Sequence, residues 1–133
     1  MIKFTVPGNP VPQGRQRFFR RGKFVGNYQP HESRDYKSKV EMIARQLNID
    51  MITNPVTVKI DFYFIRPKKF CRKKDNAGRI ACPVRPDIDN LCKAVFDALN
   101  GIAWRDDGLI WSVGARKWYC EIGGKPRTEI EAY

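Results

Sequence analysis

The chain has 133 residues, a length that fits one domain and can bury a hydrophobic core without disulfides or structural metals. Hydrophobic residues make up 42% of it and aromatic residues 12%, which excludes an intrinsically disordered chain. The formal net charge of +11 favours a polyanionic partner. Nucleic acid is the preferred partner, ahead of an anionic membrane surface. No apolar run approaches the ~18 residues of a membrane span.

The N-terminus and the cysteines bear on compartment and metal content. MIKFTVPGNP has too short an apolar stretch for a signal peptide, so a cytoplasmic protein with no membrane contact is expected. The four cysteines form no CxxC pair, and His31 is the only histidine. We therefore expect reduced cysteines and no zinc site.

The first half of the chain predicts a strand, a hairpin and a helix. Residues 2–6 form the expected strand, which ends at a turn-rich stretch rich in glycine and proline. RFFRRGKFVG then predicts a short basic hairpin that turns near Gly22. From residue 33 to residue 47, apolar side chains recur at the spacing of a helix.

The second half begins with the clearest strand. Residues 56–65 alternate, with Val56, Val58, Ile60, Phe62 and Phe64 on one face. A connection of about twenty residues, 66–85, is rich in charge, and loops of that length are usually functional or mobile. A helix over 88–99 and strands over 109–119 and 127–133 complete the chain. This order predicts an α+β fold, a mixed β-sheet with two helices packed on it, in one domain spanning 1–133.

The start of the second helix carries two acidic residues in a basic chain. Asp87 follows Pro86, so it is expected at the N-cap, where a carboxylate contributes about 1 kcal/mol. Asp89 lies in the first turn, where the helix dipole favours an anion. Capping alone could explain the pair. The alternative is a metal site, because a cap residue is not yet helical and can converge with Asp89 on one cation.

Other charged residues extend this pattern. Asp89, Lys93 and Asp97 fall along one stripe opposite the apolar face. Lys93 could hold a phosphate, or could form a surface ion pair with either aspartate. Asp106 and Asp107 form an ordinary turn sequence in WRDDGLIW, which would lie beside Asp87 if helix and strand are neighbours. Three carboxylates at one point would need a cation such as Mg²⁺.

DIDNLCKAVFDALNGIAWRDD resembles the signature of the RusA-type Holliday junction resolvases, which reads DxDNLxKxxxDAL followed by a DD turn. PVPQGRQRFFRRGKF is similar to the opening of phage-borne members of that family. The resemblance implies a homodimeric, Mg²⁺-dependent endonuclease, with Mn²⁺ as a substitute ion, that cuts two symmetrically placed phosphodiesters in a four-way DNA junction. In recombination and repair such an enzyme would resolve Holliday junctions.

The resemblance also implies roles for particular residues. Asp87, Asp89 and Asp107 match the metal-binding carboxylates, and Lys93 matches the essential lysine. Asn90 and Asp106 match supporting positions of the motif.

Basic residues gather in two clusters that we expect to contact the DNA backbone. They are Arg15, Arg17, Arg20, Arg21, Lys68, Lys69, Arg72, Lys73 and Lys74. Phe18, Phe19 and Phe24 could stack on unpaired bases, or at least one of the first two could belong to the core. The basic run in 66–79 could instead be a solvated flexible loop. Arg116 and Lys117 beside Trp118 are a weaker third cluster.

Two other functions remain open at this point. One is a non-catalytic DNA-binding module, in which the aspartates only cap a helix and form a turn. The other is a nuclease that prefers flaps or replication forks.

Overall fold

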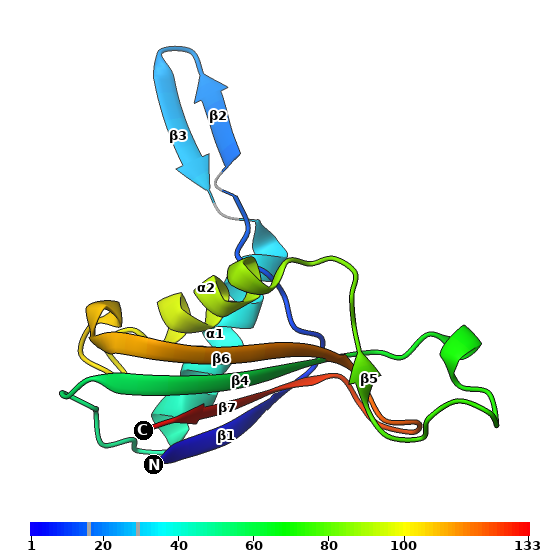
Figure 1. The fold of residues 1–133 in the computed structure, drawn as a ribbon. Coiled ribbons are helices and arrows are strands. Elements are labelled where there is room, and N and C mark those ends of the chain that lie inside the picture. The colour runs from blue at the N-terminus through cyan, green and yellow to red at the C-terminus, as the bar shows by residue number, and fades with distance from the viewer. Residues whose placement is uncertain (16, 29) are drawn as a thin grey trace.

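The computed structural model describes residues 1–15, 17–28 and 30–133, and the side chains of Arg17 and Tyr28 lie outside this description. Five strands form one sheet in the order β1-β7-β4-β6-β5, and β2 and β3 form a separate hairpin (Figure 1). The strands are β1 Ile2–Pro7, β2 Arg17–Arg21, β3 Phe24–Tyr28, β4 Val56–Phe64, β5 Ile80–Ala81, β6 Ile110–Tyr119 and β7 Arg127–Ala132. The helices are α1 His31–Gln46 and α2 Ile88–Leu99, with single 3-10 turns η1 Lys68–Phe70 and η2 Asp107–Leu109. The predicted α+β fold is confirmed.

The sheet is mixed because of one crossover. β4 and β6 are parallel, and α2 lies in the connection between them, as a parallel pair requires. β7 pairs antiparallel with both β1 and β4, and β5 pairs antiparallel with β6. The mixture of orientations therefore comes from the β4–α2–β6 unit.

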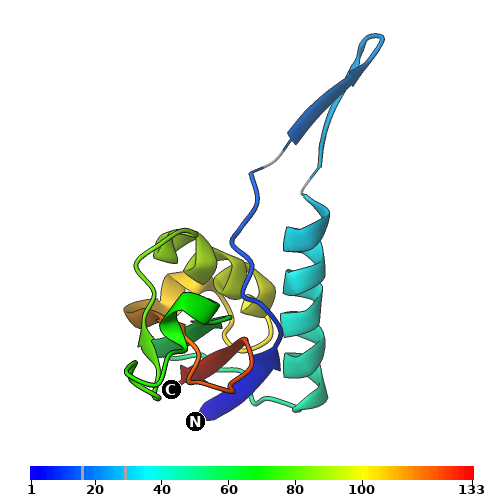
Figure 2. The same cartoon turned by 90° about the vertical axis from the view of Figure 1, so that its right-hand side faces the viewer.

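Both helices lie on one face of the sheet, which we call the helix face (Figures 1 and 2). The predicted alternation of β4 is confirmed, since Val56, Val58, Ile60 and Phe62 are almost fully buried under the helices. Tyr36 of α1 shares a 2.6 Å hydrogen bond with Thr128 of β7, and burial raises the pKa of Tyr36 to about 12. None of the described helices has the length and apolarity to cross a membrane.

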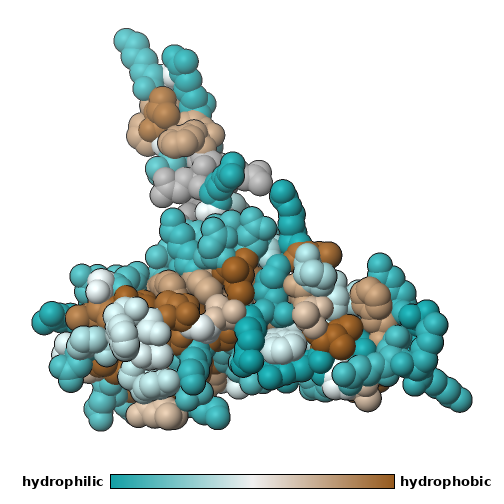
Figure 3. Space-filling model, in the orientation of Figure 1, coloured by the Kyte–Doolittle hydropathy of each residue, from teal (hydrophilic) through white to brown (hydrophobic). Residues whose placement is uncertain are grey.

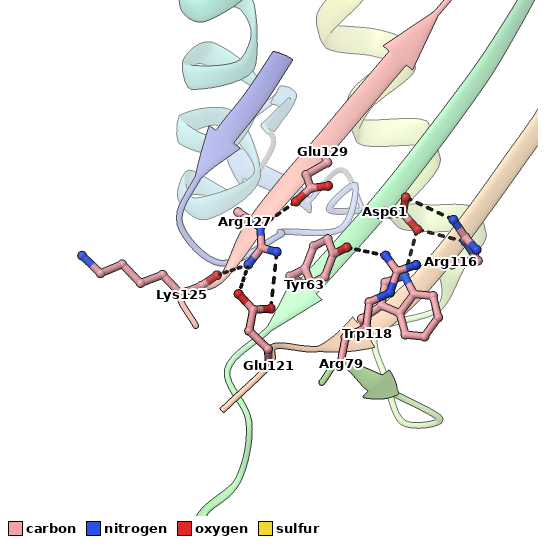
Figure 4. Close-up of polar contacts among 9 residues, drawn as sticks. All are labelled: Asp61, Tyr63, Arg79, Arg116, Trp118, Glu121, Lys125, Arg127 and Glu129. Carbon is pink, nitrogen blue, oxygen red and sulfur yellow. Dashed lines mark hydrogen bonds and ion pairs between the residues drawn. The ribbon is translucent and has the colours of Figure 1, made fainter. Parts of the chain in front are cut away.

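The other face of the sheet, the open face, carries a network of charged and aromatic side chains (Figure 4). The Arg127 guanidinium lies 3.9 Å from the ring centroid of Tyr63, and Arg79 donates a 2.6 Å hydrogen bond to the Tyr63 hydroxyl. Asp61 accepts hydrogen bonds from Arg116 at 3.0 Å and from the Trp118 indole at 2.8 Å. These contacts bury Tyr63 to 3% exposure although no helix covers it.

The hairpin β2–β3, called the arm, projects from the body (Figures 1 and 3). Its hydrophobic side chains remain in solvent, with Phe18 74%, Phe24 63% and Phe19 38% exposed. Phe19 and Phe24 contact each other with ring centroids 6.0 Å apart. The alternative that one of these phenylalanines belongs to the core is therefore wrong.

The long connection from β4 to α2 is held by one buried arginine. Arg66 is 8% exposed, and its guanidinium donates to the carbonyls of Phe70 at 2.9 Å, Gly78 at 2.9 Å and Asn76 at 2.5 Å. Three carbonyls from separate parts of the loop thus converge on one side chain. The alternative of a merely solvated loop does not fit this ordered arrangement.

Replacing Arg66 with Met should lower the free energy of unfolding by about 2 kcal/mol or more, because three carbonyls lose a charged donor inside the loop. Urea denaturation monitored by circular dichroism measures the change. Arg72→Met is the matched control, since Arg72 pairs with Asp75 at the surface of the same loop. That control should change the free energy of unfolding far less, because exposed ion pairs contribute little. Equal effects of the two variants would contradict the assigned role of Arg66.

Candidate active site

Two unpaired carboxylates mark the N-terminal end of α2. Asp87 occupies the N-cap position with φ −69 and ψ 141, but its side chain makes no capping hydrogen bond. Asp89 lies in the first turn, and both side chains are exposed. Within the described part of the chain, no hydrogen bond or ion pair holds either carboxylate. The position predicted for Asp87 is confirmed, whereas the side-chain interaction that capping requires is missing.

The backbone that leads into Asp87 is fixed from β6. The Lys117 ammonium donates to the carbonyl of Val84 at 2.5 Å and to that of Pro86 at 2.8 Å. The Cys82 amide donates to the Lys117 carbonyl at 3.1 Å. The sequence predicts a weak DNA contact for Lys117 beside Arg116, but the Lys117 ammonium makes these intramolecular contacts. It therefore positions the start of α2 relative to the sheet.

A second contact at this helix end involves a residue that the sequence did not single out. The Gln13 amide donates to the Asn90 carbonyl at 3.0 Å, which places the turn-rich N-terminal segment against the first turn of α2. The side-chain oxygen Oε1 of Gln13 is buried and has no hydrogen-bond partner among the described residues. An unpaired buried acceptor carries a desolvation cost. Gln13 lies within the PVPQGRQRFFRRGKF segment, where its spacing does not mark it out from its polar neighbours.

The remaining charged stripe of α2 faces solvent. Lys93 and Asp97 are exposed, and the apolar stripe opposite them is buried except for Ile88, which is 36% exposed. Cys92 lies beside Asp89, and burial first, then the Asp89 charge, raises the pKa of its thiol to about 11. Cys92 therefore carries no charge at neutral pH and adds no anion to the Asp87 and Asp89 pair.

Asp107 lies at the opposite end of α2. Its amide donates to the side-chain oxygen of Asn100, the C-cap residue, at 3.1 Å, and its carboxylate accepts from the Trp104 indole at 2.8 Å. Burial raises the pKa of Asp107 despite the Trp104 hydrogen bond, and the charges of Asp97 and Asp106 raise it further. Asp106 accepts from the Gly108 amide at 3.3 Å, as its turn sequence predicts.

The acidic residues are thus divided between two ends of one helix. α2 has 12 residues, so its ends are about 18 Å apart. The expectation that the DD turn lies beside Asp87 is wrong, because the turn follows the C-terminal end of α2. Among the described residues, no group of three His, Cys, Asp or Glu side chains is arranged to hold a metal ion. Asp97 is the carboxylate of the α2 stripe that lies nearest this turn, as its effect on Asp107 indicates.

The predicted DNA contacts occupy two separate surfaces. Lys68, Lys69, Lys73 and Lys74 are exposed on the loop that Arg66 organises, and Arg72 there pairs with Asp75. Arg15, Arg20 and Arg21 are exposed on and near the arm, and the Arg20 side chain donates to the Gly22 carbonyl at 3.0 Å. The side chain of Arg17 lies outside the described residues.

A groove of about 620 Å³ on the open face of the sheet is lined by Arg116 of the weaker third cluster and by none of the other predicted site residues. Charged side chains of both signs line it, including Lys3, Lys59 and Glu131. Its positive charge is therefore not concentrated enough to attract a polyanion. Its carboxylates have basic neighbours, which makes them poor ligands for a metal ion.

Replacing Lys117 with Met should loosen the segment before α2, because the carbonyls of Val84 and Pro86 lose their shared donor. Hydrogen exchange followed by mass spectrometry should show faster exchange in peptides covering 82–91. Lys117→Arg should restore protection, since the guanidinium can reach the same carbonyls. Arg116→Met, which changes the open face at the next residue, should leave these peptides unaffected. Unchanged exchange in Lys117→Met would exclude the positioning role.

The chain matches a known family over nearly its whole length. The family model described as "Endodeoxyribonuclease RusA" matches residues 7–133. A Bacillus subtilis (strain 168) protein described as "Uncharacterized protein YqaN" is 36% identical over 135 residues, covering 97% of this chain and 93% of the relative. "Crossover junction endodeoxyribonuclease RusA" of Escherichia coli O139:H28 is 29% identical over 125 residues, covering 91% of this chain and 88% of the relative.

Proposed function

The chain belongs to the RusA family of endodeoxyribonucleases, and from this membership we propose that it resolves four-way DNA junctions as a homodimer. The junction as substrate is suggested by the relative named as a crossover junction endodeoxyribonuclease. Family membership makes the chain an enzyme, which sets aside the non-catalytic DNA-binding module. A preference for flaps or forks is the second candidate, to be separated by substrate competition.

The observation that carries the proposal is the pair of carboxylates at the start of α2. Asp87 sits where it could cap the helix and does not, and Asp89 makes no ion pair although the chain has a net charge of +11. Two exposed carboxylates two residues apart repel each other unless a cation lies between them. Their oxygen donors suit Mg²⁺, which commonly binds one or two carboxylates and fills its other positions with water and phosphate oxygens.

In this proposal Asp87 and Asp89 hold Mg²⁺, and Lys93 lies one turn further along the same exposed stripe. When bound, the ion supplies positive charge at the scissile phosphate and lowers the pKa of a water molecule. The Lys93 ammonium binds a phosphate oxygen and stabilises the negative charge that develops during hydrolysis. The Asn90 carbonyl, which accepts from the Gln13 amide, and the hydrogen bonds of Lys117 hold the first turn of α2 in position for binding the ion and the phosphate.

Asp107 lies at the far end of α2 from Asp87 and Asp89 in its own chain. A helix of about 18 Å cannot bring Asp107 to the ion that Asp87 and Asp89 hold. Asp107 can join that ion only from the second subunit of a dimer. The homodimer that two symmetrical cuts require thus also completes the set of three carboxylates.

The DNA would lie along surfaces that carry exposed lysine and arginine. The loop whose backbone Arg66 orders carries four exposed lysines, Lys68, Lys69, Lys73 and Lys74. Because this backbone is already ordered, little of its conformational entropy is lost on binding. The arm presents Arg20 and Arg21 next to exposed phenylalanines. Such contacts release counterions from the phosphates, so the affinity should fall steeply with salt concentration.

Asp89→Asn should lower the rate of junction cleavage at least 100-fold, because the amide removes one negative charge from the ion-binding pair. Junction binding without metal should remain, since the basic surfaces are unchanged. Cleavage of a labelled four-way junction with Mg²⁺ or EDTA, beside a gel-shift titration, measures both. Linear duplex, flap and fork substrates in the same assay test the substrate preference.

Glu32→Gln is the matched control, because Glu32 is the acidic residue in the first turn of α1. It should leave both cleavage and binding at the wild-type level. If Asp89→Asn cuts the junction as fast as wild type, the assigned role of the α2 carboxylates is wrong.

The divided site predicts complementation between two inactive variants. Asp89→Asn and Asp107→Asn chains, co-expressed with different affinity tags and purified as a heterodimer, would contain one intact site. They should nick one strand of the junction, whereas either homodimer should be inactive. The measurement is product analysis on a denaturing gel.

The control pairs Asp87→Asn with Asp89→Asn, which damages the α2 carboxylates of both chains. That heterodimer should remain inactive. A site formed within one chain would give no activity in either mixture, and such a result would refute the contribution of Asp107 from the partner.

A further inference from the structure

The arm combines positive charge with aromatic side chains and contains no acidic residue. Residues 15–28, RQRFFRRGKFVGNY, include five Lys or Arg and four Phe or Tyr, and the first acidic residue of the chain is Glu32. On the open face of the sheet, by contrast, the arginines form ion pairs with Asp61, Glu121 and Glu129. The basic residues of the arm therefore have no acidic neighbour within it to neutralise their charge.

The pairing of β2 with β3 gives the arm two different faces. In its register Arg20 lies opposite Val25, and Phe19 lies opposite Gly26. Because side chains alternate along a strand, Phe18 shares one face with Arg20 and Val25, and Phe19 lies on the other. We call the first of these the Phe18 face.

The face that carries Phe19 is occupied by contacts within the arm. The Phe19 ring lies across Gly26, where an added Cβ atom would come within 2.6 Å of the ring, and its centroid is 6.0 Å from that of Phe24. A two-stranded hairpin is at best marginally stable alone in water. This aromatic contact across the two strands therefore serves to stiffen the arm.

The Phe18 face has no comparable packing. Phe18 is 74% and Val25 63% exposed, and none of the aromatic contacts among the described residues involves Phe18. Arg20 on the same face donates to the Gly22 carbonyl at 3.0 Å, which holds its guanidinium beside the turn. An exposed ring beside unneutralised positive charge suits a ligand that offers both phosphates and flat rings, which describes nucleic acid with unpaired bases.

The base of the arm is joined to the end of α2 that carries the exposed carboxylates. The Gly14 amide donates to the Ser33 hydroxyl at 3.1 Å, and Ser33 is 2% exposed at the start of α1. The neighbouring Gln13 amide donates to the Asn90 carbonyl in the first turn of α2. A Cβ atom on Gly14 would come within 2.7 Å of the Pro30 ring, so the segments that lead into and out of the arm are in close contact. Figure 1 shows the arm rising from the end of the body where α2 begins.

This attachment limits the distance between the Phe18 face and the carboxylates. Phe18 is five residues beyond Gln13, and an extended chain spans at most about 18 Å over that length. Successive phosphates on one DNA strand advance about 3.4 Å along the helix axis. A base in contact with Phe18 therefore lies within roughly six nucleotides of a phosphate held at Asp89.

We propose that the Phe18 face of the arm binds unpaired bases at the branch point of the DNA, with Phe18 stacked on a base and Arg20 on a neighbouring phosphate. The inference rests on the proposed function, because it takes branched DNA as the substrate. Bases inside a duplex are stacked and paired, so their faces are closed to Phe18. The ring thus adds affinity for branched DNA alone, whereas the basic residues add affinity for any DNA.

Binding titrations without metal separate stacking from charge. The probes are a labelled four-way junction, a linear duplex with the same number of nucleotides, and a duplex with a central bubble of unpaired bases. Phe18→Ala should weaken binding of the junction and the bubble at least about fivefold and leave duplex binding unchanged. Arg20→Gln should weaken binding of all three probes and reduce the salt dependence.

The matched control is Leu47→Ala, which removes an exposed apolar side chain beyond the end of α1. It should change none of the three affinities. Phe18→Trp, which keeps an aromatic ring, should bind as wild type does, whereas Phe18→Leu, which keeps only the apolar bulk, should bind as Phe18→Ala does. Circular dichroism should confirm that each variant is folded.

A second titration tests the same contact from the DNA side. Abasic nucleotides at the branch point of the junction remove the bases that Phe18 would stack on. Wild type should lose at least about fivefold in affinity for this junction, and Phe18→Ala should bind the abasic and the intact junction equally.

Equal losses on duplex and junction in Phe18→Ala would overturn the proposal, as would a wild-type affinity that abasic nucleotides leave unchanged. A wild type that binds duplex as tightly as the bubble and the junction would also overturn it. Because no readout depends on cleavage, the two proposals can fail separately. Preference for the bubble and the junction through Phe18 without any cutting would retain the arm contact and reject the function. Junction cutting by a protein whose affinities do not depend on Phe18 would retain the function and reject the arm contact.

Discussion

The packing of α2 against the sheet is the constraint on which the arrangement of the acidic residues depends. Leu91, Val95 and Leu99 have no exposed surface, so one face of the helix is packed into the hydrophobic core along its length. A rise of about 1.5 Å per residue then sets the separation of its two ends. Asp87 and Asp89 are fixed at one end and Asp107 at the other, whatever the surrounding loops do. The same hydrophobic contacts that stabilise the domain therefore decide which carboxylates can meet.

Much of the fold could be predicted because it follows from local patterns. The alternation over β4 and the helical spacing over α2 each reflect burial on one face, and the structure confirms both. The two-residue strand β5 could not be predicted, because it exists only through its pairing with β6 and the contact of Cys82 with Lys117. The predicted helix over 88–99 already separates Asp107 from Asp87, but the sequence does not say how the chain returns after that helix. The hydrogen bonds of Asp107 with Asn100 and Trp104 hold it at the C-terminal end of α2.

Basic residues in this chain serve two purposes that the composition cannot separate, because some stabilise the fold and others face solvent. Arg66 and the basic residues after it form one run in the sequence, yet Arg66 is buried and binds three carbonyls while its lysine neighbours face solvent. Arg79 and Arg127 likewise contact Tyr63 on the open face. Arginine suits these roles because its planar group donates several hydrogen bonds in fixed directions, and lysine suits a mobile contact with phosphate. The net charge of the chain therefore overstates the charge that is available to DNA.

The placement of the two acidic groups at opposite ends of one helix also bears on regulation. A lone chain carries both halves of the carboxylate set and cannot join them, so in the proposed scheme its chemistry is silent until two chains associate. Activity would then follow mass action and fall faster than protein concentration whenever dimers dissociate. A nuclease of this kind would cut little DNA when it is scarce. It would become active where a branched substrate gathers two copies, so the folded geometry itself would act as a concentration threshold.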